Sequence, residues 1–250
     1  MSRPRILGVP TDPITFEAML VQIEQWINTG DRLHQICTVN PEFIVMAQTD
    51  AAFYQVLQAA DLCVLDGWGA VWALRGRGIQ VPERVTGSDG VPLLMARAAD
   101  KGWRVFLLGA GEGIAAQAAE ILRKQHPSLQ IVGTHAGTPH PDAAEQIIQM
   151  INAASPDILL VAYGAPQQDQ WIALHRDRLR VKVAMGVGGV FDFITENVPR
   201  APLWMRRWGI EWLYRLYLQP SRWKRMLRLP RFAIQALLFG ERPPRHARQS

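Results

Sequence analysis

Short apolar segments alternate with helix-forming segments over the first 200 residues, and this alternation constrains the fold more than any other feature. The strand candidates are β-branched or leucine-rich and span residues 33–39, 62–66, 104–109, 129–133, 157–164 and 181–188. The helix candidates carry apolar residues at three- and four-residue spacing and span residues 14–27, 88–100, 112–125, 141–154 and 167–179. Strands separated by helices pair in parallel through right-handed crossovers. The sequence therefore predicts an α/β fold, a Rossmann-like layered sandwich with a mainly parallel sheet.

The last fifty residues differ in composition from the rest. From Ala201 to the end there are eleven Arg and Lys against two Glu, whereas residues 1–200 carry 16 basic and 20 acidic residues. The same fifty residues hold four of the nine tryptophans. We therefore predict two parts, a catalytic α/β domain over 1–200 and a basic, Trp-rich helical appendage over 201–250.

The appendage is a candidate for binding to a membrane surface. Arg222, Arg225 and Arg228 recur at three-residue spacing beside apolar residues, which is typical of an interfacial helix on an anionic leaflet. A solvated basic face packed on the core is the alternative. No run of about 18 uncharged apolar residues is present, which argues against a spanning segment. No nucleic-acid-binding motif accompanies the charge, so nucleic acid is not expected as a partner.

The two cysteines and the amino-terminal sequence indicate a reducing compartment. Cys37 and Cys63 each lie inside a strand candidate, as buried thiols do. The amino-terminal sequence lacks the apolar core of a signal peptide, so we expect a cytoplasmic protein. No HExxH or CxxC spacing appears, and we expect no metal site and no cofactor.

Asp66 is the most informative acidic residue. It follows the strand candidate at 62–66 and precedes Gly67 and a segment with two tryptophans. One interpretation is a helix cap, with the carboxylate accepting free backbone N–H groups. The other is a ligand-binding residue at the carboxyl end of a strand, where open α/β sheets bind their ligands. The residues alone leave both open.

Glycines lie at the ends of three further strand candidates. LLGAGEG (107–113) supplies Gly109 and Gly111, but its GxGxG spacing departs from the GxGxxG dinucleotide fingerprint. Gly164 precedes Gln168 in GAPQQDQW, and Gly188 and Gly189 belong to GVGGVFDF. Each of these glycines is a candidate for a nucleotide-phosphate loop. For LLGAGEG a tight strand-to-helix turn is an equal alternative. For GAPQQDQW the alternative is a solvent-facing first turn of the next helix, which the segment alone favours, and GVGGVFDF has the same ambiguity.

Seven motifs in order resemble the WecG/TagA/CpsF glycosyltransferases over residues 5–238. They are TVNPE (38–42), LDGWG (65–69), RVTGSDG (84–90), FLLGAGEG (106–113), YGAPQQDQWI (163–172), GVGGVFDF (186–193) and RAPLWMRRWGIEWLYRLYLQPSRWKR (200–225). The departures are small: Gln167 stands where lysine is common, Asp169 where glutamate is usual and Ile210 where leucine is usual.

The resemblance implies an inverting, metal-independent transfer of an N-acetylmannosamine-type sugar. The donor would be a UDP-sugar and the acceptor a sugar on a polyprenyl diphosphate, at the inner face of the cell membrane. Asp66 matches the family's general base, which takes the proton of the acceptor hydroxyl. The substrate-binding positions that match are Thr38, Asn40, Arg84, Gln168, Glu211, Arg215 and Arg222. An arginine among them would neutralise the leaving diphosphate.

Two other classes of protein remain as alternatives. A nucleotide-binding oxidoreductase would use the glycine loop at 107–113, although Gly133 and Thr134 stand where such enzymes have an acid. A non-enzymatic, membrane-binding α/β module would use the basic appendage alone. The sequence does not specify the UDP-sugar, the acceptor glycan or the oligomeric state, and a homo-oligomer is possible because the Trp-rich appendage must be covered.

Overall fold

A parallel six-stranded sheet forms the centre of the molecule. The computed structural model describes residues 3–218, 220, 223 and 228–247. The sheet order is β4-β3-β8-β7-β5-β6, and every pairing is parallel. The strands are β3 (His34–Val39), β4 (Leu62–Leu65), β5 (Arg104–Gly109), β6 (Gln130–His135), β7 (Ile158–Ala162) and β8 (Val183–Gly186). The predicted fold class is thus confirmed, with each predicted strand found within two residues of its expected ends.

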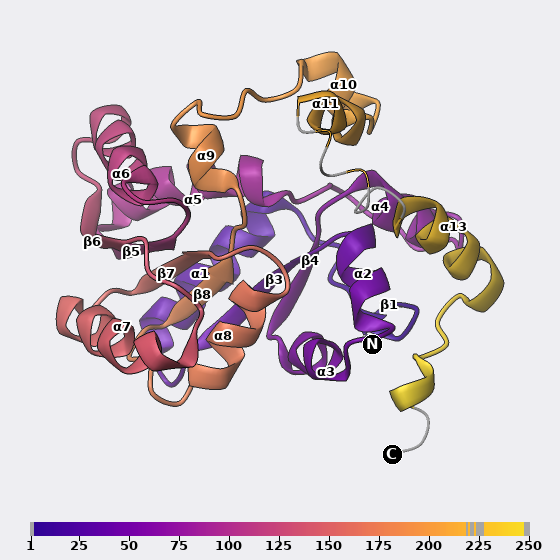
Figure 1. Ribbon diagram of the computed structural model, residues 1–250, viewed down its shortest axis with the longest axis horizontal. Helices are drawn as coiled ribbons and strands as arrows, with labels where there is room; N and C mark the ends of the chain where they lie inside the picture. The colour runs from indigo at the N-terminus through magenta and orange to yellow at the C-terminus, as the bar shows by residue number, and fades with distance from the viewer. Residues whose placement is uncertain (1–2, 219, 221–222, 224–227, 248–250) are drawn as a thin grey trace.

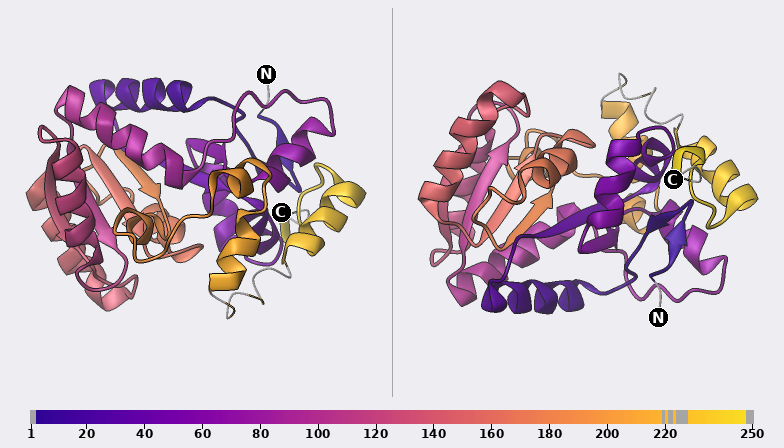
Figure 2. Two further views of the ribbon diagram at one scale, coloured as in Figure 1. Left: turned by 90° about the horizontal axis from the view of Figure 1, so that it is seen from above. Right: turned by 90° about the horizontal axis from the view of Figure 1, so that it is seen from below.

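Helices cover both faces of the sheet (Figure 1). One face packs against α1 (Phe16–Thr29), α5 (Gly87–Lys101), α6 (Ile114–Gln125) and α9 (Val190–Ile194). The other packs against α7 (Pro141–Ala154) and α8 (Gln167–His175) over its middle strands, and against α2 (Pro41–Ala47), α3 (Ala51–Ala59) and α4 (Trp68–Arg75) beside β3 and β4. Figure 2, seen from above and from below, shows the helices that cover the two faces of the sheet. All five predicted helices are present, and α4 is the helix that the cap interpretation of Asp66 had assumed. The sequence pattern had not indicated α2, α3 or α9.

The amino terminus forms a small antiparallel hairpin of β1 (Arg5–Ile6) and β2 (Val9–Pro10) against the α2–α4 side of the core. Cys37 and Cys63 are fully buried and unpaired, as expected, and lie opposite each other on β3 and β4. Most strand residues are buried on both faces because helices cover both, which explains why the strands read as continuous apolar runs.

The described part of the last fifty residues is mainly helical and packs along one side of the α/β core. They form α10 (Leu203–Arg207), α11 (Glu211–Leu218), α13 (Arg228–Phe239) and the short 3-10 turn η2 (Arg245–Ala247), seen at the top and right of Figure 1. Phe232 of α13 is buried in the core beside α2 and α4. No helix among the described residues is long and apolar enough to cross a membrane.

Ion pairs join these helices to the core. Arg200 and Arg206 contact the Asp89 carboxylate of α5 at 2.8 and 3.4 Å. Burial alone would raise the pKa of Asp89, but the hydrogen bonds from Thr86 and Arg200 hold it below its ordinary value. At α13, Arg228 pairs with Glu42 at 2.5 Å, and Arg77 pairs with Glu241 just after the helix. Whether residues 201–250 form a domain of their own stays a prediction.

Candidate active site

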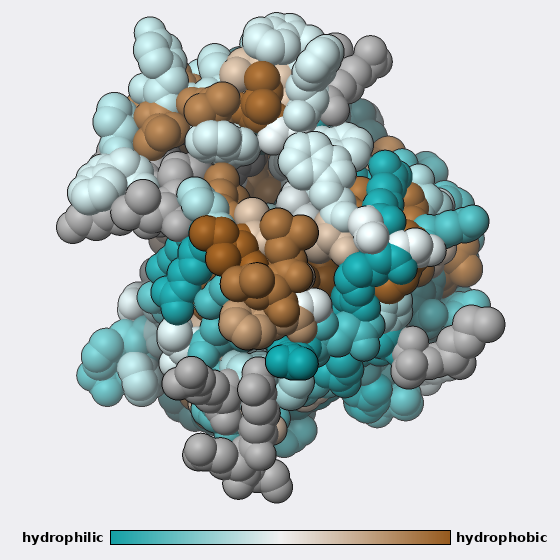
Figure 3. Space-filling view, turned by 90° about the vertical axis from the view of Figure 1, so that its right-hand side faces the viewer, coloured by the Kyte–Doolittle hydropathy of each residue, from teal (hydrophilic) through white to brown (hydrophobic). Residues whose placement is uncertain are grey.

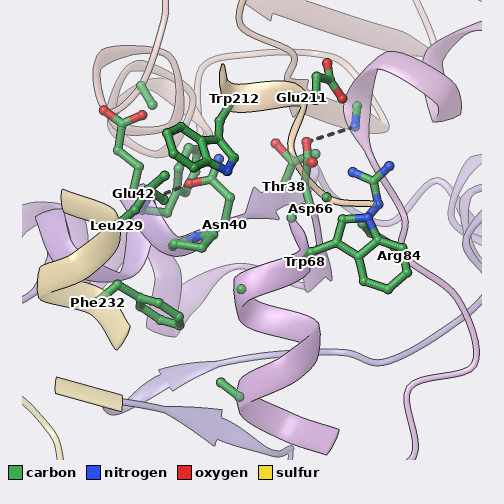
Figure 4. A pocket seen from close by; sticks show the side chains of 18 of the residues that line it. Thr38, Asn40, Glu42, Asp66, Trp68, Arg84, Glu211, Trp212, Leu229 and Phe232 are labelled. Carbon is green, nitrogen blue, oxygen red and sulfur yellow. Dashed lines mark hydrogen bonds between the residues drawn. The ribbon is translucent and has the colours of Figure 1, made fainter. Parts of the chain in front are cut away.

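A cavity of about 970 Å³ opens at the carboxyl ends of four neighbouring strands. The loops after β4, β3, β8 and β7 form one wall, and α11 and α13 form another. The sheet order brings these four strand ends side by side, although they are far apart in the sequence. Figure 4 shows the polar part of the cavity, where Asp66, Thr38 and Asn40 lie below Glu211 and Trp212. A volume of this size accommodates a nucleotide-sized ligand together with part of a second substrate.

Asp66 lines the cavity directly after β4 and does not cap the helix that follows. The cap position of α4 is Gly67, which has φ 123° and makes no side-chain cap bond. A side chain at position 67 would be strained at this φ and would crowd Pro41, so only glycine turns the chain here without cost. The Asp66 carboxylate instead accepts a hydrogen bond of 3.2 Å from the Gly87 amide, at the first turn of α5. Among the described residues no amide of α4 is found to donate to this carboxylate, so the structure gives the helix-cap interpretation for α4 no support.

Thr38 and Asn40 come from the end of β3, beside β4, and both line the cavity. Thr38 is buried, and its methyl group faces the start of α5. Asn40 caps α2, because its Oδ1 accepts the Phe43 amide at 3.0 Å. Asn40 therefore caps α2 and lines the cavity at the same time, because the cap bond fixes the orientation of its side-chain amide.

Arg84 lies over the indole ring of Trp68, with its guanidinium carbon 5.6 Å from the ring centroid. Both residues line the cavity, and Figure 4 shows them stacked beside Asp66. Stacking on an aromatic face restricts the arginine side chain without neutralising its charge. The site therefore holds a fixed positive charge near Asp66. Within the described residues, no group of three or more His, Cys, Asp or Glu side chains is placed to hold a metal ion.

Gln168 reaches the cavity from the first turn of α8. Its side chain is 2% exposed, and Oε1 accepts the Gly188 amide at 2.9 Å. This bond connects the loops after β7 and β8 and orients the glutamine amide. A solvent-facing first turn, the alternative for this segment, does not describe Gln168, because it is buried.

The glycine candidates divide into two groups. Gly164, Gly188 and Gly189 line the cavity, whereas Gly109 and Gly111 do not. The strand order explains this, because β5 lies beyond β7. The end of β5 is therefore farther from Asp66 than the ends of the four strands that border the cavity. Gly109 has a packing reason of its own: a Cβ there would lie 2.7 Å from the Ala162 backbone. A phosphate-binding role of any of these glycines stays a prediction.

The carboxyl-terminal helices contribute to the same cavity. Glu211, a predicted contact, lines it at the start of α11. Arg215 lies in α11 but its side chain is outside the described part, and Arg222 is outside the described residues altogether. The sequence reasoning had not singled out Arg206, Trp212, Phe232 or Glu42, which also line the cavity. The local signal available was the aromatic and basic run at 204–212.

Behind Gln168, Asp169 is fully buried, and neither carboxylate oxygen makes a hydrogen bond among the described residues. Burial raises the pKa of Asp169 to about 7, although the Gln168 and Cys37 side chains nearby offset part of the shift. Folding therefore opposes ionisation of this carboxyl. Below the unfolded-state pKa of Asp169, this burial does not lower the free energy of unfolding. As the pH rises from about 4 the free energy of unfolding falls, and the loss is complete above about 7.

We expect Asp169→Asn to stabilise the protein at pH 8 and to have little effect near pH 4. The amide has the same shape without a charge, so the burial cost disappears, which is worth at most about 4 kcal/mol. Urea unfolding at both pH values measures the difference. Asp177→Asn, at an exposed position just after the same helix, is the control. An equal effect of Asp169→Asn at the two pH values would contradict a titrating buried carboxyl.

Comparison with known proteins gives a consistent result over nearly the whole chain. The model of the "Glycosyl transferase WecG/TagA/CpsF family" matches residues 4–246. A Bacillus subtilis (strain 168) protein named N-acetylglucosaminyldiphosphoundecaprenol N-acetyl-beta-D-mannosaminyltransferase is 35% identical over 202 residues, which is 81% of this chain and 78% of that protein. A Bacillus spizizenii protein of the same name is 35% identical over 207 residues, covering 83% of this chain and 79% of its own.

Proposed function

Because the chain belongs to the WecG/TagA/CpsF family of glycosyl transferases, we propose that it moves an N-acetylmannosamine-type sugar from a UDP-sugar to a sugar on a polyprenyl diphosphate. The chain is a glycosyltransferase, as its relatives are. The names of both relatives specify an N-acetylmannosaminyl group and an N-acetylglucosaminyl-diphosphoundecaprenol acceptor. The oxidoreductase and the non-enzymatic module are not supported by any of these relatives.

In the proposed reaction Asp66 is the general base. Its carboxylate takes the proton of the acceptor hydroxyl while that oxygen forms a bond to the anomeric carbon of the donor sugar. The bond from the anomeric carbon to the UDP oxygen breaks, and UDP leaves with the electron pair. One displacement inverts the anomeric centre, so one carboxylate is sufficient. The observation that carries the proposal is the position of Asp66 in a large cavity, with its carboxylate oriented by the Gly87 amide.

The charge of the departing diphosphate requires a positive partner. Arg84 is held over Trp68 beside Asp66, and Arg206 lines the same cavity. A guanidinium group can bind two phosphate oxygens at once and stabilises the charge that develops on them. We therefore propose that arginines perform this task without a metal ion. Thr38, Asn40, Gln168 and Glu211 would bind the sugars and the nucleotide, with Arg215 and Arg222 contributing from the appendage.

The appendage has a second proposed role, at the membrane surface. Its described helices expose several large apolar side chains, among them Trp208 at 75% and Tyr217 at 81%. Aromatic side chains beside arginines bind well at the boundary between lipid headgroups and acyl chains. We propose that this part of the chain associates with the inner face of the cell membrane, where a lipid-linked acceptor is located.

A transfer assay tests the proposed function. Purified protein would be incubated with radiolabelled UDP-N-acetylmannosamine and an N-acetylglucosamine-diphosphate prenyl ester, with and without EDTA. We expect a disaccharide-lipid product at the same rate in both. UDP-N-acetylglucosamine as donor is the specificity control. Absence of product with every UDP-sugar would refute the proposal, and loss of activity with EDTA would refute its metal-free form.

We expect the combined change Trp208→Ser and Tyr217→Ser to lower the partition coefficient for anionic vesicles by about tenfold or more, because two apolar side chains no longer enter the interface. Cosedimentation with phosphatidylglycerol vesicles measures this. The control is Leu174→Ser on α8, which removes an equally exposed side chain (74%) from another part of the surface. Equal losses in the two proteins would show that binding is not located at the appendage.

A further inference from the structure

The cavity continues beyond its polar part into an apolar groove between α4 and α13. We call this part the α4–α13 groove. From α4 it is lined by Gly69, Trp72, Ala73 and Gly76, and from α13 and its end by Leu229, Phe232, Ala233, Ala236, Leu237 and Gly240. On each helix these residues recur at three- and four-residue spacing and so share one face. Trp72 is the only one of these with a hydrogen-bonding group, and Arg77, which also lines this end of the cavity, is paired with Glu241. The Asp66 end of the same cavity is much more polar.

The two helices run side by side and are fixed at both ends. Near the start of each, the Phe232 ring lies 3.4 Å from the position that a Cβ on Gly69 would occupy. At this end Arg228 also ties α13 to Glu42 of α2, and at the other end Arg77, just after α4, pairs with Glu241, just after α13. From Gly69 to Gly76 the groove follows α4 for roughly 10 Å, at about 1.5 Å per residue. The α4–α13 groove is therefore formed between two packed helices and leads away from Asp66.

The outer side of α13 continues the apolar surface. Ile234, Leu237, Leu238 and Phe239 are exposed, with Leu237 at 87%. Figure 3 shows hydrophobic side chains gathered on the face that carries α13, next to a hollow and surrounded by hydrophilic residues. An exposed apolar patch of this kind, continuous with a cavity, is typical of a site for an apolar ligand.

The chemistry of the proposed acceptor matches this arrangement. Such an acceptor carries a sugar, a diphosphate and an isoprenoid chain in that order. When its sugar hydroxyl reaches Asp66, the chain must leave the polar part of the cavity within a short distance. Among the described residues, a uridine nucleotide would find only the indole N–H of Trp72 and the already paired Arg77 there, too few partners for its base and ribose, whereas an isoprenoid chain needs none.

We propose that the α4–α13 groove binds the isoprenoid units of the acceptor that lie next to its diphosphate. This inference rests on the proposed function and extends it to the lipid part of the substrate. The groove selects the acceptor by its chain, while the polar end of the cavity selects its sugar. The chain then continues over the exposed apolar side of α13 toward the bilayer.

Binding of farnesyl diphosphate, measured by equilibrium dialysis without membranes, tests the groove independently of catalysis. We expect Ala233→Trp, and separately Ala73→Trp on the facing helix, to raise the Kd by about tenfold or more, because an indole in the groove excludes several methylene groups. Leu174→Trp on α8 is the control, since it adds the same side chain at an exposed position (74%) outside both the cavity lining and the apolar side of α13. Unchanged binding in both groove variants would overturn the inference, as would equal displacement by a short-chain phosphatidylglycerol.

Transfer kinetics distinguish this inference from the proposed function. With geranyl, farnesyl and geranylgeranyl acceptors, the native protein should show a KM that falls as the chain lengthens, and Ala233→Trp should remove that dependence while leaving the KM for the UDP-sugar unchanged. Transfer that does not depend on the length of the isoprenoid chain would overturn the inference about the groove and leave the proposed function intact. Selective farnesyl diphosphate binding without transfer to any acceptor would retain the groove and refute the proposed function.

Discussion

Replacing Asp66 by asparagine should lower kcat for sugar transfer by about 10²- to 10⁴-fold, the range that general-base catalysis contributes. Asparagine has the same shape, and its Oδ1 can still accept the Gly87 amide that holds the aspartate at 3.2 Å. It lacks a basic oxygen for the acceptor proton. The variant therefore isolates proton transfer from folding and from the local hydrogen bond.

Two measurements accompany this result. Titration of UDP should give an unchanged Kd, since Asp66 is proposed to contact the acceptor hydroxyl and not the nucleotide. Thermal unfolding should show a normal Tm for Asp66→Asn. Full transfer activity in the variant would show that Asp66 is not the base, and the mechanism proposed above would then be wrong.

Removing the positive charge at Arg84 should have the second largest effect, a fall of about 100-fold in kcat/KM. In Arg84→Met the side chain can still lie on Trp68, but the leaving diphosphate loses a charged donor. Arg84→Lys should restore only part of the activity, because an ammonium cannot form the paired bonds of a guanidinium. Steady-state kinetics with varied UDP-sugar measure both changes.

The control for Arg84 is Arg97→Met. Arg97 belongs to α5, pairs with Glu17 and Glu24 of α1, and does not line the cavity. We expect its replacement to leave kcat/KM unchanged. If Arg97→Met were as damaging as Arg84→Met, the loss would reflect overall charge or stability and not the diphosphate.

The strands and most helices could be predicted because their signals are local. An apolar run such as residues 158–162 is buried on both faces wherever its strand lies in a parallel sheet, so its pattern does not depend on its neighbours. The order of the strands is not local. The long connection from β4 to β5 places β5 beyond β7, and only this order separates Gly109 from the cavity that Gly164 and Gly188 line.

From the residues alone the site could be predicted only where a residue ends a strand, whereas Arg84 and Glu211 were predicted through the family resemblance. Asp66, Asn40 and Gln168 all follow strands, and the carboxyl ends of neighbouring parallel strands meet at one edge. Arg206 and Phe232 could not be found in this way, because they reach the cavity through packing of the last fifty residues on α2, α4 and α5. That packing depends on ion pairs and buried contacts between distant segments, which periodicity does not reveal.

The first turn of α5 connects Asp66, the proposed base, to the segment that carries Arg200 and Arg206. The Gly87 amide holds Asp66, and two residues later the Asp89 carboxylate holds Arg200 and Arg206. A helical turn is rigid, so the two anchor points cannot shift independently. The orientation of Asp66, the proposed base, is therefore coupled to the packing of Arg206 on α5, and we expect loss of that packing to slow transfer without unfolding the α/β domain.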